Sequence, residues 1–86
     1  MIEFDPTKAA SNLAKHGIDF ADADPVFHDP SAFTSDTTVD GELRHVTTGT
    51  DALLRVVTVV WTRRGGNQRL ISARAASRKE RQVYGT

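Results

Sequence analysis

The chain has 86 residues, of which 38% are hydrophobic and 26% are charged, a composition typical of one globular domain rather than of a disordered segment. It contains no cysteine, no apolar run of the roughly 18 residues that a membrane span needs, and no secretory signal at its start. The formal net charge is zero. These features predict a single domain over residues 1–86 that works in the cytoplasm, away from membranes and without a cofactor.

The charges are distributed unevenly along the chain. Residues 63–86 contain seven lysines and arginines and a single acidic residue, Glu80, whereas the other ten acidic residues lie before them. Such asymmetry indicates a polyanionic or oppositely charged partner, with internal docking of the two parts as the alternative. The three histidines do not have the spacing of a recognised metal site, so no metal is expected.

The N-terminal segment predicts a short strand, IEF, followed by a helix. Asp5 and Pro6 are typical of the cap and the first position of a helix, and Gly17 is typical of its end. The spacing of three to four residues places Leu13 on the apolar face of this helix.

A second helix and a loop are predicted next. Asp19 can cap this helix, and Asp22 in its first turn favours its positive end. Pro25 then shortens or interrupts it, because proline lacks the N–H group. Residues 31–41 consist mainly of Ser, Thr, Asp and Gly, which predicts a loop, or a loop with an edge strand.

Three strand-like segments follow: LRHVTTG, LLRVVTVVWT and RLISARA. Gly65 and Gly66 between the last two are a hairpin signal. Ser77 and Glu80 form a capping box that opens a last helix. The predicted fold class is therefore α+β, with two N-terminal helices, an antiparallel meander of three to four strands and a short C-terminal helix.

Alternation along the two predicted hairpins divides the sheet into two faces. Two-residue connections at 65–66 and at 50–51 fix the registers, and the second places Arg44 opposite Val57. One face is then the predicted core, and it contains Leu54, Val56, Thr58, Val60, Ile71, Ala73 and Ala75. The other face is predicted to be basic, and it contains Glu42, Arg44, Arg55, Val57, Val59, Trp61, Arg63, Leu70, Ser72 and Arg74.

The basic face suggests a site for a single-stranded nucleic acid. Guanidinium groups match phosphate oxygens and keep their charge at physiological pH, and Trp61 offers a ring on which an unpaired base can stack. The alternative for Trp61 is packing in the core under the last helix. Tyr84 either ends the apolar side of that helix or points its hydroxyl into the site.

Cleavage of RNA without a metal needs a base for the 2′-hydroxyl, cations for the developing charge and an acid for the leaving oxygen. Arginine supplies only the cations. His16 is one candidate for proton transfer, although a cation at a helix end also complements the helix dipole. Glu42 acts as a base or merely orients Arg44. His45 falls on the predicted core face and is interpreted as a buried or edge residue.

Several segments together resemble the BrnT family of toxins. FDPTKAASNLAKHGIDFADA is similar to the opening signature of the family, GELRHVTTG to its Gly-Glu-x-Arg strand, TRR to its Thr-x-Arg motif, and ISARAASRKERQVY to its last strand and helix. The chain departs from this pattern at Phe4, where the family usually has Trp, at Pro25 in the second helix, and at Trp61, where a His often stands.

The resemblance implies a ribonuclease toxin of a type II toxin–antitoxin system, with a fold similar to the RelE toxins. It implies cleavage of RNA without a metal and inhibition of translation. The implied partner is a BrnA-like antitoxin with a ribbon-helix-helix region, which neutralises the toxin and provides the only contact with operator DNA. The alternative is a non-catalytic basic module that binds an antitoxin or a nucleic acid.

The matching motifs and the predicted basic face together define the candidate site. We expect a catalytic group that holds the scissile phosphate and moves the proton: His16, Glu42, Arg44, Arg63 and Arg74. We expect a second group that binds the RNA strand: Lys15, Arg55, Trp61, Arg78, Arg81 and Tyr84.

Overall fold

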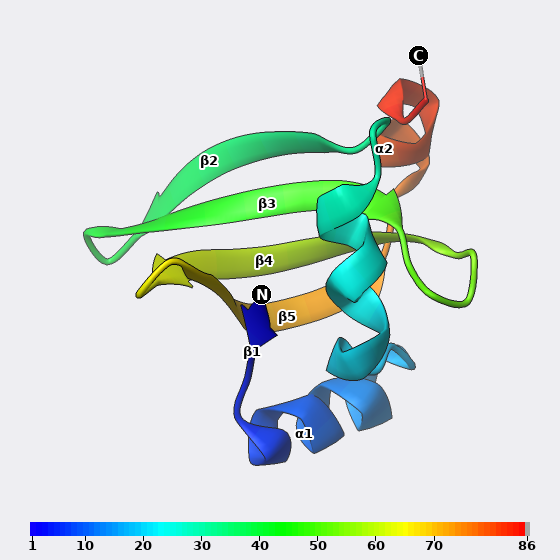
Figure 1. The fold of residues 1–86 in the computed structure, drawn as a ribbon. Helices are drawn as coiled ribbons and strands as arrows, with labels where there is room; N and C mark the ends of the chain where they lie inside the picture. Colours follow the sequence, from blue (N-terminus) through cyan, green and yellow to red (C-terminus); the bar gives the residue numbers. More distant parts are fainter. Residues whose placement is uncertain (86) are drawn as a thin grey trace.

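The computed structural model describes residues 1–85, and no helix in this range is long and apolar enough to span a membrane. In Figure 1, η1 crosses one face of the sheet, α1 lies beside β5, and α2 stands beyond the end of the strands opposite the two hairpin turns. The elements in chain order are β1 (Ile2–Glu3), α1 (Pro6–His16), η1 (Phe20–His28), β2 (Phe33–Val39), β3 (Glu42–Thr50), β4 (Val56–Arg64), β5 (Asn67–Ala75) and α2 (Arg78–Val83).

The sheet has the strand order β1-β5-β4-β3-β2. β1 pairs with β5 in parallel, and the other neighbours are antiparallel. The α+β class is confirmed, but the described sheet has five strands and is mixed, whereas we predicted an antiparallel meander of three to four. The second predicted helix is the 3₁₀-helix η1, which Asp19 caps and which contains Pro25. Its 3₁₀ form agrees with the proline, which cannot donate a helical hydrogen bond.

α1 begins and ends where its sequence predicts. The Asp5 carboxylate accepts the N–H of Thr7 at 2.8 Å, and Gly17 ends the helix with a left-handed φ of 72°. The prediction for Leu13 is wrong, because this side chain is 46% exposed. Asn12 is buried in its place.

The core lies between η1 and the sheet. Its main members on the sheet are Val57, Val59, Trp61, Leu70 and Ala73, all 6% exposed or less. On the helical side they meet Phe20, Ala23 and Val26. The predicted core face is therefore wrong for β4. Val57, Val59 and Trp61, which we placed on the basic face, are the residues of β4 that belong to the core. Leu54, a predicted core residue, is 85% exposed.

The loop between β3 and β4 explains a second error, the placing of Arg44 on the face of Val57 and Arg63. Thr50 pairs with Val56, so the connection has five residues, 51–55, instead of two. The buried Asp51 carboxylate builds this loop by accepting the N–H groups of Leu53 at 3.0 Å and Arg55 at 2.9 Å. The change in register moves Arg44 to the other face relative to Val57. Arg63 shares the face of Trp61 on the side of η1, where Arg55 also approaches Asp22, whereas Arg44 lies on the opposite face.

A bulge changes the register of the second hairpin. The two-residue turn at Gly65 and Gly66 is confirmed, because Arg64 pairs with Asn67. Farther along, however, Trp61 pairs with Leu70 and Val60 with Ser72, so β5 contains an extra residue there. Arg74 pairs with Thr58 as a result, on the face of Arg44. The predicted four-arginine face is therefore wrong.

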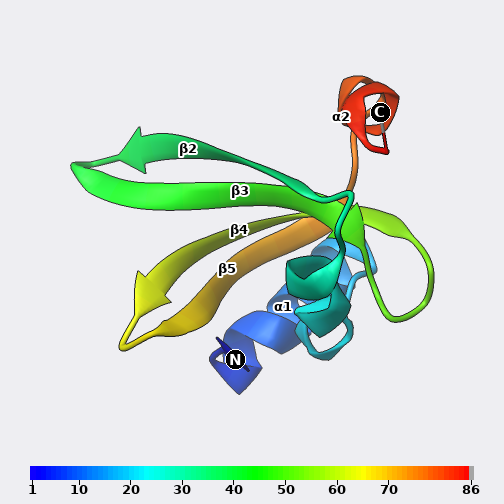
Figure 2. The same cartoon turned by 45° about the horizontal axis from the view of Figure 1, so that its top comes forward.

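The two hairpins diverge toward their turns. Pairing between β3 and β4 ends with His45 opposite Trp61, although β3 begins at Glu42 and β4 continues to Arg64. Figure 2 shows the β2–β3 turn and the β4–β5 turn well apart at one end of the sheet. This divergence opens the sheet between β3 and β4.

Candidate functional site

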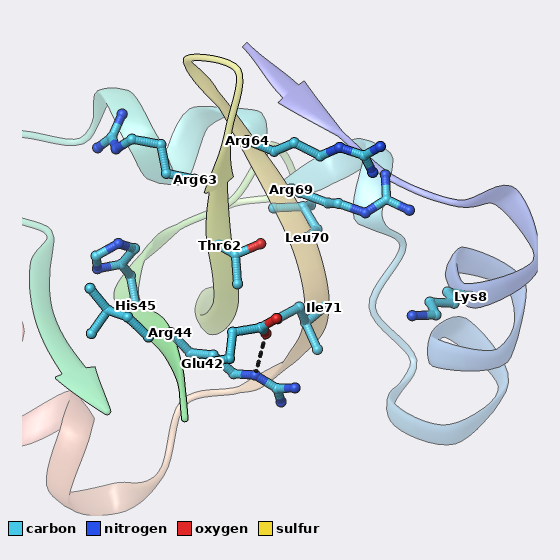
Figure 3. Close-up of a pocket in the computed structure, with 11 residues that line it drawn as sticks. Lys8, Glu42, Arg44, His45, Thr62, Arg63, Arg64, Arg69, Leu70 and Ile71 are labelled. Carbon is cyan, nitrogen blue, oxygen red and sulfur yellow. Dashed lines mark hydrogen bonds and ion pairs between the residues drawn. The ribbon is translucent and has the colours of Figure 1, made fainter. Parts of the chain in front are cut away.

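A cleft of about 580 Å³ lies where the hairpins diverge. Both hairpins and α1 contribute to its walls (Figure 3). Five of the lining residues within the described chain are basic and one is acidic, so the cleft suits an anion. The lining residues are Lys8, Glu42, Leu43, Arg44, His45, Thr62, Arg63, Arg64, Arg69, Leu70 and Ile71.

Glu42 and Arg44 form an ion pair in this cleft. The Nε of Arg44 donates to Oε1 of Glu42 at 3.1 Å, shown as a dashed line in Figure 3. Alternation along β3 puts the two side chains on one side of the strand, as predicted. The Glu42 side chain is 58% exposed, so its carboxylate orients the guanidinium and stays accessible to a ligand.

Arg63 reaches the cleft from the other side of the sheet. Its guanidinium lies 5.6 Å from the centroid of the Trp61 ring, within the range of a cation–π contact. The divergence of the hairpins therefore brings Arg44 and Arg63 to one cleft even though they start from opposite faces.

Trp61 itself is a core residue. It is 6% exposed, it packs edge-on against Phe27 at 5.3 Å, and its Nε1 donates to the Thr47 hydroxyl at 2.8 Å. A ring buried in this way has no face for an unpaired base, so the predicted stacking is wrong. The alternative of core packing is right, although η1 covers the ring and not the last helix.

Three cations of the cleft were missed in the choice of site residues. Arg64 and Arg69 flank the glycine turn and approach Glu3 at 3.9 and 3.8 Å, and Lys8 extends from α1 (Figure 3). The only feature of the sequence that pointed to the two arginines was their position beside the turn. No feature pointed to Lys8, because its position at the cleft depends on how α1 packs against the sheet.

Lys15 and His16 line a groove of about 210 Å³ between α1 and β5. This groove shares Lys8 and Ile71 with the cleft, so the two depressions adjoin. Both predicted residues are exposed in the last turn of α1. They extend the basic surface along the helix without lining the cleft itself.

Arg74 does not line either depression. Its guanidinium donates to both oxygens of Glu80, at 2.7 and 3.1 Å. This bond raises the pKa of Arg74 and, with bonds from Ser77 N–H and the Thr58 hydroxyl, lowers the pKa of Glu80 to about 2. The predicted convergence of Arg74 with Arg44 and Arg63 is thus wrong, because a carboxylate at the sheet end holds Arg74.

The Tyr84 hydroxyl is also occupied. It donates to the Asp29 carboxylate and lies 2.7 Å from the Thr50 hydroxyl. The bond lowers the pKa of Asp29 and raises the pKa of Tyr84. These contacts fasten the end of α2 to the segment after η1.

The remaining predicted RNA-binding residues lie elsewhere. Arg78 and Arg81 line a separate depression on α2. Arg55 is paired with Asp51 at 2.7 Å and Asp22 at 3.7 Å, and its Nη1 donates to the carbonyl of Gly17 at 3.1 Å. Its charge is therefore compensated inside the fold.

His45, interpreted from the sequence as a buried or edge residue, has a side chain that is 18% exposed. It lines the cleft, and its Nδ1 is 2.7 Å from an Asp36 carboxylate oxygen on β2. Among residues 1–85, no three histidine or acidic side chains converge to hold a metal ion.

Comparison with known proteins identifies the family. Residues 4–80 match the family model described as the ribonuclease toxin BrnT of type II toxin–antitoxin systems. Among solved structures, the 1.1 Å crystal structure of the Brucella abortus ribonuclease toxin BrnT is similar, with 34% identity and a TM-score of 0.73 over 90% of this chain and 96% of that one. No curated protein matches the chain. The chain belongs to the BrnT family of ribonuclease toxins, and an antitoxin partner follows from that membership.

Proposed function

We propose that this toxin cleaves RNA without a metal, and that the loss of RNA inhibits translation. A BrnA-like antitoxin with a ribbon-helix-helix region neutralises it and brings the pair to operator DNA. The fold relationship to the RelE toxins belongs to the same proposal. The family membership supports the ribonuclease activity, and the basic cleft supports its location.

The observation that carries the proposal is the clustering of five cations around one carboxylate in the cleft. Arginine forks match the oxygens of a phosphodiester and stabilise the charge that develops on them during cleavage. We assign Arg44 and Arg63 to the scissile phosphate. Arg64, Arg69 and Lys8 then hold the neighbouring phosphates of the strand.

Glu42 is the base that this arrangement supports. Its carboxylate is exposed, and its contact with Arg44 places it beside the proposed phosphate position. There it can take the proton of the attacking 2′-hydroxyl. Lys15 and His16 lie along the adjoining groove and guide the strand, and the catalytic role of His16 stays a prediction.

The roles of the remaining predicted residues follow from their contacts. Because Glu80 holds Arg74, we assign Arg74 to the attachment of α2, and a contact with RNA would require that pair to open. Arg78 and Arg81 are placed to contact the antitoxin or a distant part of the RNA. RNA contacts by Arg55 and Tyr84 also stay predictions.

The test is cleavage of a synthetic RNA by the purified chain in the presence and absence of EDTA. We expect equal rates, and we expect Arg44→Ala and Arg63→Ala to lower kcat/KM by about 100-fold or more. Lys79→Ala, outside the cleft, is the matched control. Loss of cleavage with EDTA would overturn metal independence. Binding of RNA with no cleavage would instead support the non-catalytic module.

A further inference from the structure

His45 occupies the point where the two hairpins part. It is the last residue of β3 that pairs with β4, and its partner is Trp61. The ring lies 4.5 Å from the Trp61 ring, centroid to centroid. Its side chain is 18% exposed and lines the cleft. Packing therefore fixes the imidazole while one edge stays open to a ligand.

Asp36 fixes the orientation of this ring. Its carboxylate oxygen lies 2.7 Å from Nδ1 of His45. An ionised carboxylate can only accept a hydrogen bond, so Nδ1 carries the proton and Nε2 is left to exchange one. Among residues 1–85, no hydrogen bond to Nε2 is formed. A carboxylate that fixes the tautomer of a histidine in this way favours proton transfer at the other ring nitrogen.

The charged groups around the ring fit a proton donor. Asp36 faces it from β2, and Arg63 lies against the other ring that it touches, Trp61 of β4. Glu42 and Arg44 share its own strand and the cleft. From η1, the uncharged Phe27 packs on Trp61. Figure 3 shows the imidazole and the Arg63 guanidinium on the same side of β4, away from the Glu42–Arg44 pair.

We propose that His45 is the general acid of the reaction and that Asp36 is its positioning residue. This inference rests on the proposed RNA cleavage. The 2′-oxygen forms a bond to phosphorus as Glu42 takes its proton, and the bond from phosphorus to the 5′-oxygen breaks as His45 Nε2 donates a proton to that oxygen. The products are a 2′,3′-cyclic phosphate and a 5′-hydroxyl, and no other reactant is needed.

The open sheet explains how both groups reach one phosphate. The attacking and leaving oxygens lie on opposite sides of phosphorus, so the base and the acid must approach from opposite directions. Glu42 and His45 differ by three positions along β3, an odd number, and therefore point to opposite faces. In a closed sheet these faces would be separated, but here the cleft joins them.

The test compares normal RNA with RNA in which sulfur replaces the 5′-bridging oxygen at the cleaved position. A thiolate leaves without a proton, so the second substrate needs no general acid. We expect His45→Gln and His45→Phe to lower kcat/KM on normal RNA by about 100-fold or more, and to cleave the sulfur substrate within about threefold of the unchanged protein. His45→Phe keeps a ring against Trp61 and guards against a packing defect.

Two further variants complete the experiment. Asp36→Asn should lower kcat on normal RNA by about tenfold. This variant should also regain its activity on the RNA with the 5′-bridging sulfur. His28→Gln removes the exposed His28–Asp24 pair, 3.6 Å apart and outside the cleft, and should have no effect. In the unchanged protein, the rate should fall on the alkaline side as the imidazolium is lost, and this limb should be absent from both His45 variants.

The outcomes separate this inference from the proposed function. Full activity of folded His45 variants on normal RNA, or equal losses on both substrates, would overturn the role of His45 and leave the ribonuclease proposal standing. No cleavage of either substrate by the unchanged protein would overturn both. Thermal unfolding of each variant establishes that it is folded.

Discussion

Asn12 on α1 forms hydrogen bonds with both backbone groups of Ala73 on β5. Its Nδ2 donates to the Ala73 carbonyl at 2.8 Å, and its Oδ1 accepts the Ala73 N–H at 3.1 Å. The same Nδ2 donates to the carbonyl of Ile18 at 2.9 Å. A side chain thus completes the edge of β5 beyond the short β1, and it fixes the helix that carries Lys8, Lys15 and His16.

Replacing Asn12 should destabilise the whole domain. In Asn12→Ala, the buried N–H and C=O groups of Ala73 lose their partners, at a cost of about 2–4 kcal/mol in the free energy of unfolding. Asn12→Asp keeps the size but cannot donate to the carbonyl, so we expect a similar loss. Chemical denaturation measures both. Ser11→Ala on the exposed side of α1 is the control, and a loss as large there would contradict this account.

The Arg74–Glu80 pair should make the attachment of α2 sensitive to acid. Glu80→Gln removes the charge that Arg74 contacts, and we expect a loss of about 2 kcal/mol at neutral pH. Because the pKa of Glu80 falls from 4.5 to about 2 on folding, this stability is present above pH 4.5 and is lost as the pH falls toward 2. The two proteins should therefore converge over that interval in denaturation curves. A constant difference between them would refute the assignment.

Tyr84→Phe tests whether the Tyr84 hydroxyl has a structural role. The variant loses the bonds to Asp29 and Thr50, so we expect a loss of about 1–2 kcal/mol in stability and less than a threefold change in RNA cleavage. Hydrogen exchange should show faster opening of α2 in the variant. A large drop in cleavage with no change in stability would instead support the prediction that Tyr84 contacts RNA.

Salt should weaken RNA binding through the cleft. Each phosphate contact contributes about −0.7 to the slope of log K against log salt for a single strand. Arg44→Ala should make this slope shallower by about that amount, whereas Lys79→Ala should leave it unchanged. Fluorescence titration of a labelled RNA at several salt concentrations measures the slopes. Equal slopes for all three proteins would place the RNA outside the cleft.

The features that the sequence predicts well are those with local causes. Asp5, Pro6 and Gly17 set the limits of α1, and the reciprocal bonds of Ser77 and Glu80 form the predicted capping box. These motifs satisfy backbone groups within a few residues. The family resemblance, which depends on the order of such motifs, is confirmed.

The features that failed depend on distant contacts. The loop around Asp51 has five residues and is organised by a buried carboxylate, and β5 contains a bulge opposite Val60 and Trp61. Each changes the face to which Arg44 or Arg74 belongs. The divergence of the hairpins has no local signal either, yet it creates the cleft and brings His45 to it. Alternation alone therefore identified the arginines as site residues but assigned some of them to the wrong face of the sheet.

α2 differs from the rest of the fold in that none of its described residues is buried. The Arg74–Glu80 pair and the Tyr84–Asp29 hydrogen bond attach α2 to the rest of the fold. η1, by contrast, is packed against the apolar core. Cooling weakens apolar association but not ionic contacts. Acid protonates the carboxylates and so weakens the ionic contacts but not the apolar ones. We therefore expect acid to release α2 from the sheet while η1 stays packed on the core.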